Sequence, residues 1–219
     1  MTTFLRILAA FLALASAGCV ETRFESPIGD NIETCDARWK GLWVDVDLDR
    51  RVDRAPEANF YVDEECQFMV LVQPEKNGAL KQIHVPVNYV HADRKDYIVV
   101  ADTAIRGLVD LKPPHGVIPV PEKSFFYARY RLRGDRIELY PVDSARVAKL
   151  VLDGRLEGTV DKVGTELHVY VGGSRAQMLD AVRTLAIFDE KNAIVLVRSR
   201  QTLEQYEKSM LPAGAGAAR

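Results

Sequence analysis

Hydrophobic and polar residues alternate along most of the stretch from Trp39 to Pro141. A two-residue period of this kind is typical of β-strands that bury one face. It predicts about seven short strands, at residues 43–49, 60–62, 66–72, 81–89, 97–101, 124–132 and 137–140. Because short turns such as Asn77-Gly78 and Arg133-Gly134-Asp135 connect them, we expect antiparallel pairing.

Prolines interrupt this region in two places. Pro86 falls inside the predicted strand at 81–89, which suggests that this strand is an edge strand or contains a bulge. Residues 112–122 hold four prolines and a glycine, so we expect a long loop there.

The hydrophobic period lengthens after Pro141. Asp143 can cap a helix that ends at Gly154, and Ser174 with Gln177 forms a capping-box pair that opens a second helix. Strands are predicted at 156–160, 166–171 and 193–198, and a last short helix at 202–210.

These elements predict an α+β fold. A mainly antiparallel sheet or barrel-like body at 37–141 precedes an α+β section at 142–211, and the sequence leaves open whether this section is a separate domain. Residues 212–219 are rich in alanine and glycine and are expected to be disordered.

Residues 1–18 differ from the rest of the chain. Arg6 precedes an uncharged apolar segment from Ile7 to Leu14, and the small residues 15–18 follow. This order of a basic start, an apolar centre and a small-residue exit is typical of a secretory signal peptide. The apolar segment is shorter than the roughly 20 residues that a membrane-spanning helix needs.

The end of this segment, Ser16-Ala17-Gly18-Cys19, resembles the lipobox of bacterial lipoproteins. The resemblance implies that Cys19 receives a diacylglyceryl thioether, becomes the N-terminus and anchors the chain to a membrane. Val20 in the next position implies the outer membrane, with the protein facing the periplasm. Ser16 departs from the pattern, in which Leu is usual. Ala15-Ser16-Ala17 is also a site for ordinary signal peptidase, whose action would give a soluble periplasmic or secreted protein that starts at Gly18.

The start of the mature chain lacks an apolar period. Residues 19–36 contain Pro27 and Gly29, and we expect them to form a tether between the lipid anchor and the folded body. Two cysteines, Cys35 and Cys66, remain after Cys19, and outside the cytoplasm such a pair usually forms a disulfide. Their separation does not match the paired cysteines of a zinc site.

Charge and motifs narrow the possible functions. The 29 basic and 31 acidic side chains give a net charge of −2, which argues against a nucleic-acid partner. The chain has no G-x-S-x-G motif, P-loop or H-E-x-x-H motif. Asp45-x-Asp47-x-Asp49 lacks the glycine and glutamate that a calcium-binding EF-hand loop requires at its sixth and twelfth positions.

The four histidines do not form a metal-binding motif. His84 and His168 fall on the polar face of predicted strands and are expected at the surface, whereas His91 and His115 are expected in loops. We therefore predict no enzyme, no catalytic residue, no metal site and no cofactor.

Gly41-Leu42-Trp43 is similar to the G-x-W motif that opens the lipocalin sequence pattern. That resemblance implies a barrel whose floor is closed by Trp43 and which holds a small apolar ligand. Three hypotheses about function remain. The first is a lipid-anchored envelope protein that acts through contacts with another protein or the cell wall. The alternative is a lipocalin-like carrier, which requires a pocket of several hundred Å³. The third is an enzyme whose catalytic residues are scattered along the sequence, which a cleft that gathers His91 or His115 with carboxylates would support.

Overall fold

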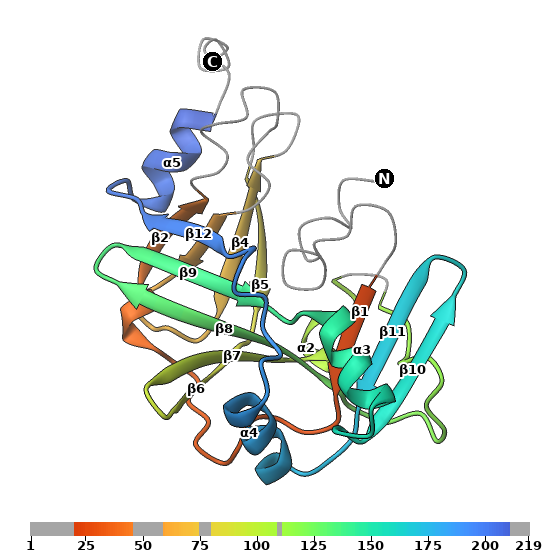
Figure 1. Cartoon of the computed structure of the whole chain (residues 1–219). Helices are drawn as coiled ribbons and strands as arrows, with labels where there is room; N and C mark the ends of the chain where they lie inside the picture. The colour runs from red at the N-terminus through yellow and green to blue at the C-terminus, as the bar shows by residue number, and fades with distance from the viewer. Residues whose placement is uncertain (1–19, 46–58, 75–79, 109–110, 211–219) are drawn as a thin grey trace.

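We analysed a computed structural model of the chain, which describes residues 20–45, 59–74, 80–108 and 111–210. Within these ranges the chain forms one mixed sheet of 12 strands with short helices beside it (Figure 1). The predicted signal peptide, Cys19, the Asn77-Gly78 turn and the C-terminal tail lie outside the described residues. No helix among the described residues has the length and apolar character needed to cross a membrane.

The strands follow one another along most of the chain. They are β1 (Val20–Phe24), β2 (Gly41–Asp45), β3 (Asn59–Val62), β4 (Met69–Pro74), β5 (Leu80–Val85), β6 (Asn88–Ala92), β7 (Lys95–Ala101), β8 (Phe125–Arg133), β9 (Arg136–Pro141), β10 (Gly158–Val163), β11 (Glu166–Val171) and β12 (Ile194–Arg198). The helices are the 3-10 helix η1 (Ala37–Trp39) and the α-helices α2 (Asp102–Ile105), α3 (Ser144–Leu152), α4 (Arg175–Thr184) and α5 (Leu203–Met210).

The sheet has the strand order β10-β11-β1-β8-β9-β12-β2-β3-β4-β5, and β7 with β6 branches off at β8. The pairing of β1 with β11 is parallel, and the other strand pairs are antiparallel. In the described residues β10 and β5 stand at the two ends of this path and do not pair. The fold is therefore α+β and mainly antiparallel, as predicted, but a barrel-like body is not supported.

Strand β8 joins the parts of the sheet. It pairs with β7 along one side, while β9 and the end of β1 share its other side. Residues Phe125 and Tyr127 point into one hydrophobic core, and Phe126 and Ala128 point into another. Both faces of β8 are buried over its first four residues, which explains why Phe125–Ala128 form a continuous apolar run.

The two cores are built from different elements. The first core contains Trp39, Trp43, Met69 and Tyr89, together with side chains from β2 to β9. The second core contains Phe24 and Tyr97 and is covered by α3 and α4, whose apolar residues include Val147 and Met178. Figure 1 shows α3 lying over β1 and β11.

The prediction of a tether at 19–36 was wrong for the start of this range. Val20–Phe24 forms strand β1, which lies between β11 and β8 inside the sheet. Thr22, Arg23 and Phe24 are buried, and so is Ile28. The alternation of polar and apolar residues is too short here to be recognised, and the main partner strand, β11, comes far later in the chain.

The local predictions after Pro141 were confirmed. Asp143 caps α3 by accepting a hydrogen bond from the backbone N–H of Arg146, and Gly154 follows the helix with a φ of 70°. Ser174 and Gln177 form the predicted capping box of α4. These elements belong to the same sheet as the rest, because β11 pairs with β1, and β12 lies between β9 and β2.

Pro86 ends a strand rather than lying inside one. The predicted strand at 81–89 is divided into β5 and β6, with Pro86 between them. Strand β5 lies at the end of the described strand order, as expected for an edge position.

Candidate functional site

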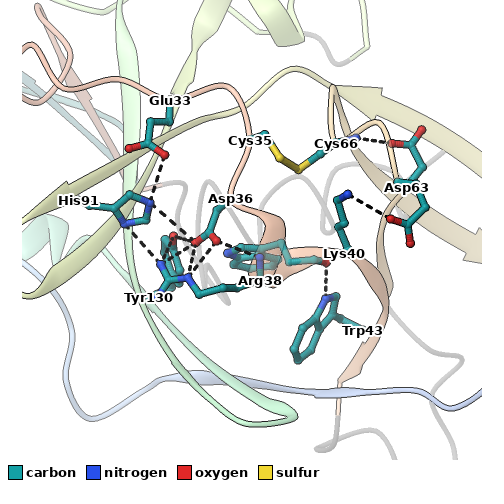
Figure 2. The surroundings of a disulfide bond; sticks show 12 residues. Glu33, Cys35, Asp36, Arg38, Lys40, Trp43, Asp63, Cys66, His91 and Tyr130 are labelled. Atoms are coloured by element: carbon teal, nitrogen blue, oxygen red, sulfur yellow. Dashed lines mark hydrogen bonds and ion pairs between the residues drawn. A yellow bond between two sulfur atoms is a disulfide. The ribbon is translucent and has the colours of Figure 1, made fainter.

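A disulfide joins the segment before η1 to the connection between β3 and β4. The sulfur atoms of Cys35 and Cys66 lie 2.14 Å apart, and their Cα atoms 5.3 Å apart (Figure 2). Cys66 has a φ of 58°, and its N–H donates a 2.7 Å hydrogen bond to the carboxylate of Asp63. The bridge holds the segment that carries Cys35 against the first core.

Asp36, the residue after Cys35, is a buried carboxylate with several donors. Its side chain caps η1 and accepts hydrogen bonds of 2.6 to 3.0 Å from the guanidinium of Arg38. The hydroxyl of Tyr130 in β8 donates another, at 2.5 Å. Burial alone would raise the pKa of Asp36, but the hydrogen bonds from Arg38 and Tyr130 hold it below its ordinary value. Asp36 is therefore an ionised group inside the protein.

His91 lies beside this pair, in β6 rather than in the predicted loop. Its Nδ1 is 2.6 Å from the carboxylate of Asp96, which faces it across the β6–β7 hairpin. Its Nε2 is 3.8 Å from Glu33 and 3.9 Å from Asp36. Figure 2 shows the imidazole between Glu33 and the Asp36–Arg38 pair. The structure thus gathers three carboxylates and the guanidinium of Arg38 around His91.

Aromatic rings close the inner side of this cluster. The ring of Trp39 meets that of Tyr130 edge-on, with centroids 5.3 Å apart, and also packs against Tyr89 and Trp43. Burial, followed by the charge of Asp36, raises the pKa of Tyr89. The phenol of Tyr89 therefore stays protonated, and the rings form an uncharged wall behind the ionised Asp36.

The cluster links three parts of the fold. Arg38 comes from η1, His91 and Asp96 come from the β6–β7 hairpin, and Tyr130 comes from β8. Its charged groups bind one another, and a backbone bridge between Glu33 and Tyr89 adds to the connection. Across the described ranges no group of three or more histidine, cysteine, aspartate or glutamate side chains has a geometry that could hold a metal ion. The cluster is therefore a network of ion pairs and hydrogen bonds, centred on Arg38 and Asp36, that lies beside the disulfide.

A second charged network lies under the proline-rich loop. Asp102 is fully buried and accepts hydrogen bonds from Ser124 at 3.0 Å and Arg106 at 2.7 Å. Its carboxylate is 3.7 Å from the buried guanidinium of Arg23, which also donates to the carbonyl of Lys112 at 2.6 Å. Burial raises the pKa of Asp102, but the hydrogen bonds from Ser124 and Arg106 outweigh it and lower the pKa overall.

The histidines show where the sequence patterns were insufficient. His84 is exposed, as predicted, but His168 is buried and its ring lies 4.1 Å from that of His115. The prediction that His168 lies at the surface was wrong because the loop at 112–122 covers the polar face of β11. A residue pattern gives the two faces of a strand but not what covers each face.

Trp43, the tryptophan of the G-x-W motif, is buried in the first core. Its indole N–H donates a 2.6 Å hydrogen bond to the carbonyl of Trp39, and the guanidinium of Arg198 lies 4.2 Å from the ring centroid. Gly41 has a φ of 105°, which favours glycine at this position. These contacts place Trp43 as an anchor between β2 and the C-terminal end of β12.

The chain was also compared with known proteins, and no protein-family model, curated protein or solved structure matches it.

Proposed function

We propose that the protein is exported and held at a membrane by a lipid on Cys19, and that it acts there through contacts with another protein or the cell wall. The observation that carries this proposal is the position of β1. The strand begins at Val20, one residue after Cys19, and it lies inside the sheet. Processing before Cys19 would therefore remove the signal peptide and leave every described strand intact.

The disulfide supports the exported location. A bridge between Cys35 and Cys66 closes a loop over a sequence separation of 31 residues and packs against the first core. Disulfides of this kind form and persist in oxidising compartments such as the periplasm, and they are rare in the cytosol.

The proline-rich loop offers a surface for a contact with another protein. Ile118 is 94% exposed and Val120 is 56% exposed, although both are large apolar side chains. The buried Pro114 and the His115 ring, which lies against that of His168, hold one end of this loop against the sheet, and Ser124, bonded to Asp102, holds the other. A fixed loop that presents apolar side chains loses little conformational entropy on binding.

A lipocalin-like carrier has less support. It requires a closed barrel around an apolar pocket, whereas the described strand path is open between β10 and β5. The Gly41-x-Trp43 motif is present, but its tryptophan packs against Trp39 and Arg198.

Intact-mass measurement of the chain expressed in a bacterium tests the proposal. We expect the wild-type protein in the membrane fraction, beginning at Cys19 and carrying a diacylglyceryl group, and we expect Cys19→Ala to lack this group and leave the membrane. Unlipidated wild-type protein beginning at Gly18 would overturn the anchor but not the export. A chain that keeps residues 1–18 in the cytosol would overturn both.

A further inference from the structure

The start of β1 lies directly beside a hairpin turn. Strands β1 and β11 run parallel, with Val20 opposite Leu167. Strands β10 and β11 form a hairpin whose last pair is Val163 with Glu166, so Leu167 is the second residue after the turn. The residue that begins β1 and the tip of the β10–β11 hairpin therefore occupy the same end of the sheet (Figure 1).

β1 is firmly held in the body of the protein. The hydroxyl of Thr22 donates a 2.7 Å hydrogen bond to that of Ser144 in α3. The ring of Phe24 stacks on that of Tyr127 with centroids 3.9 Å apart, and Arg23 is buried between Glu21 and Asp102. Detaching β1 from the sheet would expose Phe24 and separate the buried guanidinium of Arg23 from Asp102. Both changes are unfavourable in free energy.

One peptide bond connects Cys19 to this strand. Consecutive Cα atoms are about 3.8 Å apart, so only the side chain of Cys19 and its thioether separate a lipid anchor from the start of β1. A long flexible linker would let the body turn freely above a membrane, whereas this connection allows only the rotations within Cys19 and its thioether.

We propose that the tip of the β10–β11 hairpin, residues 162–165, rests on the phospholipid surface and fixes the orientation of the protein there. This inference rests on the proposed anchor. Lys162, Gly164 and Thr165 are exposed, and Val163 is 45% exposed. An apolar side chain next to a lysine suits the boundary between acyl chains and phosphate groups, because the lysine can keep its charge in the headgroup layer.

The same orientation turns another hairpin away from the membrane. In Figure 1 the turn between β8 and β9 lies at the far side of the molecule from the β10–β11 hairpin. Arg133, the last residue of β8 before that turn, is exposed and would face the aqueous compartment. This difference gives a matched pair of probe positions.

Tryptophan quenching by brominated phospholipid tests the orientation. The protein comprising residues 19–219, with the Cys35–Cys66 bridge formed, is coupled at Cys19 to a maleimide lipid and inserted into vesicles of brominated phosphatidylcholine. We expect Thr165→Trp to lose most of its added fluorescence and Arg133→Trp to lose none. Trp39 and Trp43 are fully buried and give a constant background. Equal quenching at both positions, or none at Thr165→Trp, would overturn the orientation.

Two further variants complete the design. If Thr165→Trp does not fold, Lys162→Trp probes the same tip. A flexible glycine-serine linker inserted between Cys19 and Val20 should abolish the difference in quenching between Thr165→Trp and Arg133→Trp. If the difference is unchanged, the short connection is not what orients the protein. Because the lipid is attached chemically, this result does not depend on natural lipidation. The intact-mass experiment can therefore contradict natural lipidation without affecting the quenching result, and the quenching experiment can contradict the orientation without affecting the intact-mass result.

Discussion

The hydroxyl of Tyr130 lies 2.5 Å from a carboxylate oxygen of Asp36, and this contact joins β8 to the segment that carries Cys35. Asp36 is buried and also binds Arg38. The disulfide and this hydrogen bond therefore hold neighbouring residues of one segment from two directions.

The first prediction concerns this hydrogen bond. Tyr130→Phe removes the hydroxyl but keeps the ring that packs against Trp39. Because a hydrogen bond to a charged group contributes about 1.5–3 kcal/mol, we expect the free energy of unfolding to fall by that amount. Urea denaturation measures it. As a control, Tyr61→Phe changes a half-buried tyrosine whose hydroxyl has no hydrogen bond in the described residues and should have little effect.

The second prediction concerns acid stability. The folded-state pKa values of Asp36 and Asp102 are lowered, so both carboxylates stabilise the fold above the unfolded-state pKa of about 3.9. This contribution is lost as the pH falls from about 5 through the lowered folded-state values. Asp36→Asn should be less stable than wild type at pH 7, with a smaller stability difference between pH 7 and pH 3. Urea denaturation at both pH values checks this, and an unchanged difference would contradict the assignment.

Reduction of the disulfide should destabilise the protein. The sequence separation of 31 residues gives an expected loss of about 3–4 kcal/mol in the free energy of unfolding, on the loop-entropy estimate. Denaturation with and without dithiothreitol measures the loss. The double variant Cys35→Ala/Cys66→Ala should have the stability of the reduced protein and show no response to the reductant.

Strand β1 should be required for folding. A protein comprising residues 19–219 should fold, whereas one comprising residues 25–219 lacks β1 and leaves one side of β11 unpaired. We expect the shorter protein to lose its near-ultraviolet circular dichroism and its cooperative thermal transition. Equal melting of the two proteins would show that these residues act as the originally expected tether.

The β10–β11 hairpin contains two glycines that make a matched pair. A Cβ added at Gly158 would lie 2.1 Å from the backbone oxygen of Tyr170, while one added at Gly164 would meet nothing within 4 Å. Both have positive φ values, so each substitution with alanine costs about 1–2 kcal/mol in backbone strain. Gly158→Ala should be the more destabilising because a strand must also shift. Comparable losses in denaturation would contradict the close approach.

Elements defined by neighbouring residues could be predicted from the sequence. The cap at Asp143, the capping box of Ser174 and Gln177, and the turn between β8 and β9 depend on contacts within a few residues. These predictions agree with the structure because short-range geometry decides them.

Contacts between distant residues could not be predicted in this way. The polar network brings Asp36 together with His91 and Tyr130, which share no motif and come from three separate elements. His168 is buried because a distant loop covers it, and β1 is a strand because β11 supplies its edge. In each case the decisive neighbour is one that a periodic pattern cannot identify.

The pairing of β1 with β11 also determines when the protein can fold. Val20 pairs with Leu167, so the first strand needs a partner that is synthesised roughly 150 residues later, a pairing of high contact order. Until then the edge of β1 that pairs with β11 is exposed, and unpaired strand edges are prone to aggregate. We therefore expect the pairing of β1 with β11 to form late in folding.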